Sequence, residues 1–110
     1  MKIAEIPFTV TDWNAVAPVE HKGERGTSFW RAFESRCVRT RVVEYSPGYR
    51  SDHWCPRGHV LYVLEGEFGI LLKDGRDFRL GPGMGFEVGD DETNPHLGYS
   101  EKGARVFIVD

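Results

Sequence analysis

The sequence has little of what marks membrane, secreted or nucleic-acid-binding proteins. No stretch reaches the roughly 18 consecutive apolar residues that a membrane-spanning helix needs, and residues 1–5 do not begin the apolar segment of a secretory signal. The formal net charge is −3, and Lys and Arg are interspersed with Asp and Glu instead of forming a basic run. We therefore expect no membrane partner, no nucleic-acid partner and a cytoplasmic location.

Cysteine is also scarce. The chain contains two cysteines, Cys37 and Cys55, which are too few for the disulfide framework of a small secreted domain. In a reducing cytoplasm we expect both to be free thiols that are not joined to each other.

Patterns typical of helices are nearly absent, whereas glycine and proline are frequent. The 13 glycines and 6 prolines are spread at roughly even intervals along 110 residues, which is typical of short strands joined by turns. This length fits a single domain, residues 1–110, and the pattern predicts an all-β fold, a barrel or jelly roll. The expected strands cover residues 29–33, 37–45, 60–64, 68–72, 77–80, 84–88 and 104–109, with a further strand from residue 96, and Asp74-Gly75 predicts a two-residue hairpin turn.

The first 27 residues differ from the rest and are expected to form an extension to a barrel over residues 28–110. Thr11 or Asp12 could cap a short helical turn over residues 13–16, and Pro18 would end it. Residues 20–27 are charged and contain glycine, so they are predicted to be a loop.

Three arginines, Arg36, Arg39 and Arg41, lie close together in and beside the strand expected at residues 37–45. Alternation with a period of two places the apolar and β-branched side chains of this strand on one face and Arg39 and Arg41 on the other. Because glutamates flank the arginines, we interpret them as a solvated strand face, with an anion site as the alternative.

Histidine and cysteine gather at one predicted turn. His53 and Cys55 are two residues apart, so on a strand they face the same way, and residues 56–58 then turn the chain into a strand that begins with His59. His96 opens a later strand, whereas His21 falls in the expected loop and is interpreted as an ordinary polar side chain. Imidazole and thiolate are ligands that zinc, iron, copper and nickel prefer, so this cluster is a candidate metal site.

Two segments resemble the conserved motifs of the cupins. Residues 48–66 contain a glycine, a His-x-Cys pair, a polar residue and an apolar strand that ends in Gly66, and residues 74–96 contain Gly81-Pro82-Gly83 and end in Pro95-His96. The sequence looks most similar to a small single-domain cupin subgroup that has no assigned function. This resemblance implies an antiparallel jelly-roll β-barrel with a pocket inside it.

The sequence departs from the cupin motif at two ligand positions. His59 stands where cupins have glutamate and Cys55 where they have their second histidine, while His53 and His96 match the first and last ligands. The resemblance therefore implies a divalent transition metal held by His53, Cys55, His59 and His96. A thiolate in place of a carboxylate keeps the net ligand charge but favours zinc or iron, with nickel or copper as alternatives. Because cysteine is the shorter side chain, the alternative is that the three histidines ligate and Cys55 lies beside them.

Other residues are weaker candidates for the same pocket. Asp52 and Glu44 are the nearest carboxylates in the sequence, and either could accept a hydrogen bond that orients a histidine ring. Tyr62 and Phe86 could line the pocket or pack in the core.

Three functions remain open from the sequence. The first is a metal-dependent enzyme on a small molecule, either a dioxygenase that uses iron or an isomerase that uses the metal as a Lewis acid. The second is a non-catalytic module that binds or senses a small molecule, with a structural metal. The third is a metal-free barrel whose histidines bind the ligand directly. In each case the partner is a small molecule, and the likeness to small cupins implies a homodimer.

Overall fold

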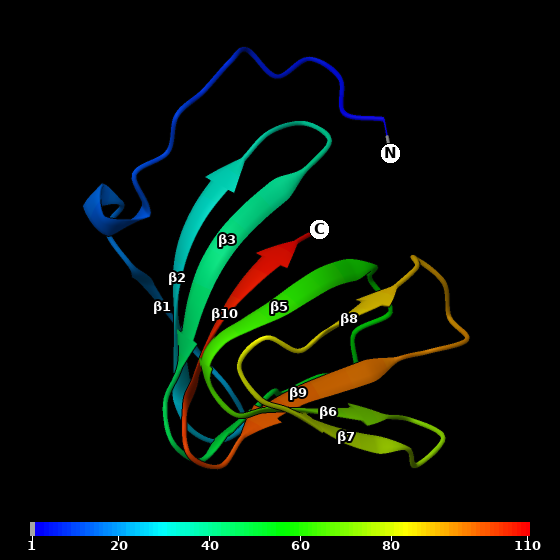
Figure 1. Ribbon diagram of the computed structural model, residues 1–110. Helices are drawn as coiled ribbons and strands as arrows, with labels where there is room; N and C mark the ends of the chain where they lie inside the picture. Colours follow the sequence, from blue (N-terminus) through cyan, green and yellow to red (C-terminus); the bar gives the residue numbers. More distant parts are fainter. Residues whose placement is uncertain (1) are drawn as a thin grey trace.

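The computed structural model describes residues 2–110, which form two antiparallel β-sheets (Figure 1). The all-β prediction and the jelly-roll prediction are both confirmed. Among the residues described, there is no helix with the length and apolar character that crossing a membrane requires.

The larger sheet has six strands and the smaller has four. In spatial order the larger sheet contains β1 (Val19–Lys22), β2 (Thr27–Glu34), β3 (Arg39–Tyr45), β10 (Ala104–Val109), β5 (His59–Gly66) and β8 (Gly85–Val88). The smaller sheet contains β4 (Tyr49–Arg50), β9 (His96–Ser100), β6 (Phe68–Leu72) and β7 (Asp77–Leu80).

The hydrophobic core lies between the two sheets and takes side chains from both. Strand β10 shows how the sequence specifies it: Ala104, Val106 and Ile108 alternate with less buried residues, so every second side chain points inward. Facing residues from both sheets complete the core: Val43, Leu61, Val63, Phe68, Ile70 and Leu80. This core fixes strands β3, β5 and β10, which carry most of the polar groups described below.

The turn at Asp74-Gly75 joins β6 to β7, as predicted, but the loop is longer than two residues. Leu72 accepts a hydrogen bond from the amide of Gly75 and donates its own to Arg76, which leaves three residues outside the ladder. Gly75 has φ of 101°, a conformation that glycine adopts at little cost. A type I turn followed by such a residue is a common three-residue hairpin loop.

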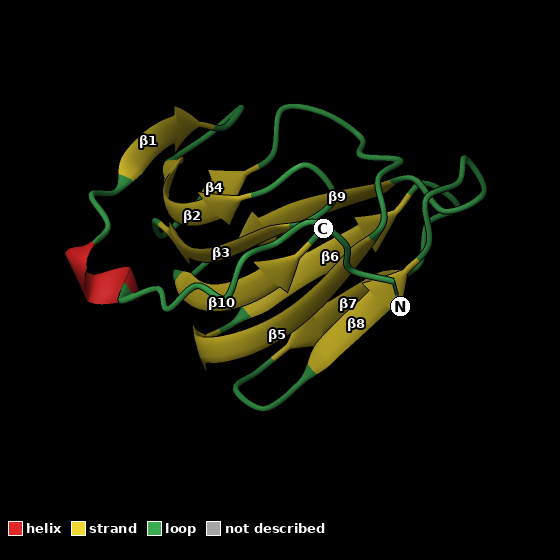
Figure 2. Ribbon diagram, turned by 90° about the horizontal axis from the view of Figure 1, so that it is seen from above, coloured by secondary structure: helices red, strands yellow, loops and turns green. Residues whose placement is uncertain are grey.

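The N-terminal segment contains the expected helical turn and one unexpected strand. A 3₁₀ turn, η1 (Trp13–Ala15), is capped by the side chain of Asp12, which accepts a hydrogen bond from the amide of Asn14. The loop predicted at residues 20–27 is wrong in part, because Val19–Lys22 forms β1 at the edge of the larger sheet, beside β2 (Figure 2). All four residues of β1 are exposed, so no apolar alternation revealed the strand.

The interpretation of Arg39 and Arg41 as a solvated strand face is also wrong. Both side chains point into the barrel, on the same face of β3 as the core residue Val43. The opposite face of β3 is covered near η1, where Arg31 donates a hydrogen bond to the carbonyl of Val16 and Val42 is buried. Both faces of β3 are therefore covered. The apolar side chains predicted on one face of this strand lie on its outer side, so they did not show which face points into the barrel.

Candidate metal centre

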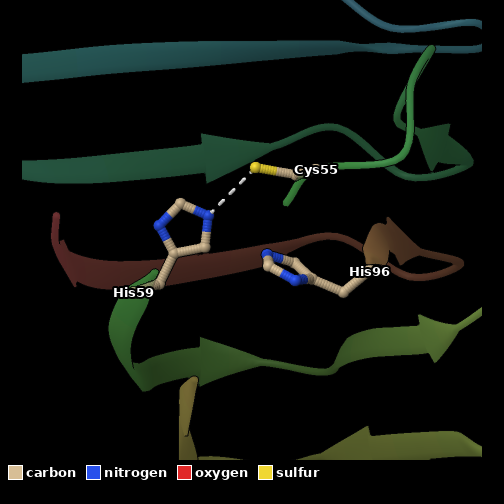
Figure 3. Close-up of side chains that lie close together, drawn as sticks. All are labelled: Cys55, His59 and His96. Carbon is tan, nitrogen blue, oxygen red and sulfur yellow. Dashed lines mark hydrogen bonds between the residues drawn. The ribbon is translucent and has the colours of Figure 1, made fainter. Parts of the chain in front are cut away.

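Three of the four predicted metal ligands come together at one end of the barrel. The Cys55 sulfur and one ring nitrogen each from His59 and His96 all lie within 4.8 Å of one another. Figure 3 shows both imidazole rings and the thiol directed toward a shared space. We refer to these residues as the Cys-His-His triad.

Backbone pairing positions the triad. His59 is the first residue of β5 and shares the inward face with Leu61 and Val63. His96 is the first residue of β9, and Cys55 forms an isolated bridge with it: the Cys55 amide donates to the His96 carbonyl at 2.8 Å, and the reverse bond measures 3.0 Å. The loop that carries Cys55 is thus fixed to the smaller sheet, next to one of the two histidines.

His96 presents an unpartnered nitrogen to the triad. Its Nδ1 lies 3.1 Å from the carbonyl oxygen of Asn94, so Nδ1 carries the proton and donates it. Its Nε2 is buried and has no hydrogen-bond partner among residues 2–110, and the residue as a whole is only 4% exposed. Burial lowers the pKa of His96, so the ring is neutral near pH 7. A neutral, unpartnered Nε2 is the form of histidine that binds a metal.

His59 lies between Cys55 and a carboxylate. Its Nε2 is 3.5 Å from the Cys55 sulfur, and its Nδ1 is 3.0 Å from the Oδ2 atom of Asp110. The second contact has the length of an ion pair, although its angle is not that of a hydrogen bond. A carboxylate on one ring nitrogen orients the imidazole and makes the other nitrogen a better ligand.

Asp110 is the centre of a buried ionic cluster. Its carboxylate is 0% exposed and accepts two hydrogen bonds from Arg39, at 2.9 and 2.8 Å, and one from Arg41 at 3.1 Å. Burial alone would raise the pKa of Asp110, but contacts with His59, Arg39 and Arg41 outweigh it and hold this pKa well below its usual range. Asp110 is therefore ionised.

The remaining predicted ligand, His53, lies outside the triad. Its side chain is 68% exposed, and its Nδ1 is 2.7 Å from the carboxylate of Asp52. His53 still lines the same cavity as the triad. Asp52 thus contacts a histidine, as the sequence suggested, but this histidine is the one that does not join the triad.

The other sequence candidates are divided between the inside and the outside of the barrel. Phe86 lines the cavity and meets His96 edge to face, with ring centroids 5.9 Å apart. Tyr62 follows Leu61 on β5, so it points to the outer face and is 50% exposed. Glu44 is also outside, paired with Arg31 at 3.5 Å and Arg105 at 3.8 Å. Alternation along β3 and β5 accounts for both outward positions.

The cavity beside the triad has a volume of about 220 Å³. Its lining contains the triad and the arginines, and also a group of aromatic side chains in which Tyr45 contacts both Tyr49 and Phe68. Burial raises the pKa of both tyrosines, so their hydroxyls remain protonated. This volume is below the roughly 300–1,000 Å³ of drug-sized ligand pockets, so the cavity suits a small molecule.

Asp110 and the inward arginines were not found from the sequence as parts of the site, although a signal for Asp110 exists. Continuing the alternation of Ala104, Val106 and Ile108 by two residues reaches residue 110, which therefore faces inward as well. The register of β10 against β3 then places it next to Arg39, and each of these two residues donates its amide to the other's carbonyl.

The sequence matches no protein-family model, and it matches no curated protein. Solved structures do match. A predicted oxalate decarboxylase from Thermotoga maritima is 14% identical, with a TM-score of 0.77 over 92% of this chain and 96% of its own. A polyketide cyclase from Streptomyces resistomycificus is 23% identical, with a TM-score of 0.73 over 94% of this chain and 78% of its own.

A third similar structure is a sugar phosphate isomerase of the cupin superfamily from Silicibacter pomeroyi. It is 14% identical and has a TM-score of 0.70 over 92% of this chain and 74% of its own. At such identities these likenesses show the fold and not the activity.

Proposed function

We propose that this chain, which has the cupin fold, binds one divalent transition metal through the Cys-His-His triad and uses it to bind or transform a small molecule. The observation that carries the proposal is the buried Nε2 of His96, which has no partner among residues 2–110 and points at two further ligand atoms. A buried polar atom without a partner is costly, and a metal ion would remove that cost.

The donor set fits such an ion. Two imidazole nitrogens and one thiolate suit zinc or iron, and they are compatible with nickel or copper. Manganese and magnesium prefer oxygen ligands and fit less well. Bound metal would also keep Cys55 as a thiolate, because a coordinating thiol is deprotonated.

The number of converging ligands favours a catalytic type of site. Three protein ligands leave coordination positions for water or a substrate, whereas four would close a tetrahedral site. When bound, the metal would supply Lewis acidity, or oxygen activation if it is iron. The chain itself would orient His59 through Asp110, keep His96 neutral, and surround the small molecule with the aromatic side chains that line the cavity.

Metal analysis of protein purified without a histidine tag tests this proposal. We expect about one equivalent of zinc or iron per chain, as purified or after reconstitution. His96→Ala should lose the metal. His21→Ala is the matched control, because His21 stacks on Trp30 and is not part of the triad. Less than about a tenth of an equivalent in the reconstituted wild type would refute the proposal.

The second candidate is a binding or sensing module with a structural metal, and the position of His53 favours it. His53 lines the same cavity, so a rotation of its side chain could supply a fourth ligand and close the site. The coordination number of the bound metal distinguishes the two candidates: three protein ligands plus water support catalysis, and four protein ligands support the structural role.

We also propose that the protein is a cytoplasmic homodimer. The N-terminal segment supports the dimer, because its apolar side chains Ile3, Phe8 and Val10 are exposed and would be covered by a second copy. A reducing compartment fits a site that needs Cys55 free of any disulfide, so that its sulfur can bind the metal.

A further inference from the structure

Three guanidinium groups share the cavity with the Cys-His-His triad, and their charge is not balanced. Arg39, Arg41 and Arg57 all line the cavity. Among residues 2–110, Asp110 is the only acidic side chain within ion-pair distance of any of them, at 2.8, 3.1 and 4.0 Å. This wall of the cavity therefore carries a net positive charge.

Arg41 is the most buried of the three. Its side chain is 7% exposed, and its guanidinium carbon lies 4.1 Å from the centre of the Trp30 ring. It donates one hydrogen bond, from Nη2 to Asp110, whereas its Nε is buried and has no partner among the described residues. A guanidinium group has five N–H donors, so Arg41 retains donors for a ligand. Stacking on Trp30 holds the plane of the group in place.

Asp110 cannot satisfy Arg41 alone, because it is shared. Arg39 engages both oxygens of the carboxylate, and the Oδ2 atom also lies 3.0 Å from the Nδ1 atom of His59. Burying a charge is expensive unless it is paired. A second anion in the cavity would complete the pairing of Arg41.

We propose that Arg41, with Arg57 at the rim, binds the carboxylate of a small organic acid whose other end reaches the metal. The inference rests on the proposed function, because it takes the metal cavity as the place where the small molecule binds. Oδ2 of Asp110 lies 3.1 Å from Nη2 of Arg41 and 3.0 Å from Nδ1 of His59, so these two nitrogens are at most about 6 Å apart. The other nitrogen of the same ring, Nε2, faces Cys55 in the triad, so Arg41 and the triad are separated by little more than one imidazole ring and one carboxylate.

The cavity favours a carboxylate over a phosphate. Apolar side chains, among them Leu61, Phe68, Ile70 and Phe86, form much of its lining, and its volume is about 220 Å³. Moving an anion from water into such surroundings costs more as its charge grows, and phosphate carries more charge than carboxylate at neutral pH. A planar carboxylate also matches two parallel N–H groups of a guanidinium group.

Binding of matched acids and amides to the zinc-loaded protein tests the inference. The probes are propionate and pyruvate, each compared with its primary amide, and inorganic phosphate. Calorimetry should show binding of the acids and at least about tenfold weaker binding of the amides, which have the same shape but no charge. In nitrogen-15 NMR spectra, propionate should shift the signal of the Arg41 Nε–H group.

Three variants assign the effect. Arg41→Gln should weaken propionate binding by roughly ten- to a hundredfold, because a hydrogen-bonded charge pair is lost. Arg57→Gln should weaken it less, because the Arg57 side chain is 54% exposed. Arg105→Gln is the control: Arg105 is on the outer face of β10 with Glu44 and Glu65, and its loss should have no effect. If Arg41→Gln does not fold, the shift of the Arg41 Nε–H signal by propionate in the wild type decides, because a carboxylate bound only to the zinc would leave that signal unchanged.

The outcomes separate this inference from the proposed function. Acids and amides that bind equally well, or acids that do not bind, would overturn the inference, and so would unchanged binding in a folded Arg41→Gln variant or a preference for phosphate. In any of these cases the proposed function stands if the wild-type protein still holds zinc. Conversely, protein that binds propionate through Arg41 but retains no metal would overturn the proposed function and leave the carboxylate site.

Discussion

Replacing Asp110 by asparagine tests whether one buried carboxylate stabilises the fold. The substitution keeps the shape of the side chain and removes its charge. Asp110 is 0% exposed and contacts Arg39, Arg41 and His59 at 2.8, 3.1 and 3.0 Å. The two arginine side chains are 18% and 7% exposed, so the variant would leave buried cations without a counter-ion.

The expected loss of stability is large. Breaking a buried ion pair by removing one partner costs about 3–5 kcal/mol, because the other charge stays buried and unpaired. Asparagine can still accept one hydrogen bond from Arg39, so we expect the lower end, about 3 kcal/mol. The total stability of a domain is only about 5–15 kcal/mol, and for about 100 residues this loss corresponds to a fall in Tm of roughly 12–24 °C.

Urea unfolding at pH 7, followed by tryptophan fluorescence, measures the difference in free energy of unfolding. Glu44→Gln is the control with the same chemical change, because Glu44 is 49% exposed and pairs with two arginines on the outer face. Its cost should stay below about 1 kcal/mol. A cost for Asp110→Asn that is equally small would refute the reasoning, because it would mean that the cluster contributes little to stability.

The difference should also depend on pH in a defined direction. The folded-state pKa of Asp110 lies below its ordinary value of 3.8, so its contribution is complete above that value and is lost as the pH falls below it. The stabilities of the wild type and Asp110→Asn should therefore differ fully at pH 7, and the difference should shrink progressively as the pH falls below about 4 toward the folded-state pKa. A difference that stays constant into acid would show that the charge of Asp110 is not its cause.

Four further outcomes are expected. Cys55→Ser should weaken zinc binding, and alkylation of Cys55 should be slow with metal bound and fast after chelation; alkylation that ignores the metal would place the sulfur outside the site. His53→Ala should retain most of the metal affinity that His96→Ala loses, since only His96 belongs to the triad; equal losses in a zinc titration would make His53 a fourth ligand. Light scattering at micromolar concentration should give twice the chain mass of 12.5 kDa, and a value near one chain would contradict the dimer. Thiol titration of the denatured, non-reduced protein should count both Cys37 and Cys55 as free, whereas a count near zero would contradict the reducing compartment.

The sequence predicted the fold because local patterns and the cupin motifs agree. Glycine and proline punctuation marks the strands, and alternation in Ala104, Val106 and Ile108 marks the inward face of β10. The comparison with solved structures confirms the likeness to cupins at the level of the fold. Strand β1 was missed because an exposed edge strand is specified by pairing with β2 and not by an apolar pattern.

The candidate site could be predicted only in part, because it depends on contacts between distant residues. His53, Cys55 and His59 are close in sequence, but which two of them face His96 depends on the path of the loop between residues 51 and 58. The role of Asp110 depends on the pairing of β10 with β3. Arg39 and Arg41 were expected to be solvated because period-two alternation shows which residues share a face but not which face points into the barrel.

X-ray absorption spectroscopy of the zinc-loaded protein tests the central claim most directly, because it measures the distances between the metal and its ligands. If Cys55, His59 and His96 hold the ion, the spectrum will show one sulfur at about 2.3 Å and two imidazole nitrogens at about 2.0–2.1 Å. A water oxygen will fill the coordination position that the three protein ligands leave open. A first shell without sulfur, or with sulfur beyond about 3 Å, would show that Cys55 is not a ligand and would contradict the account.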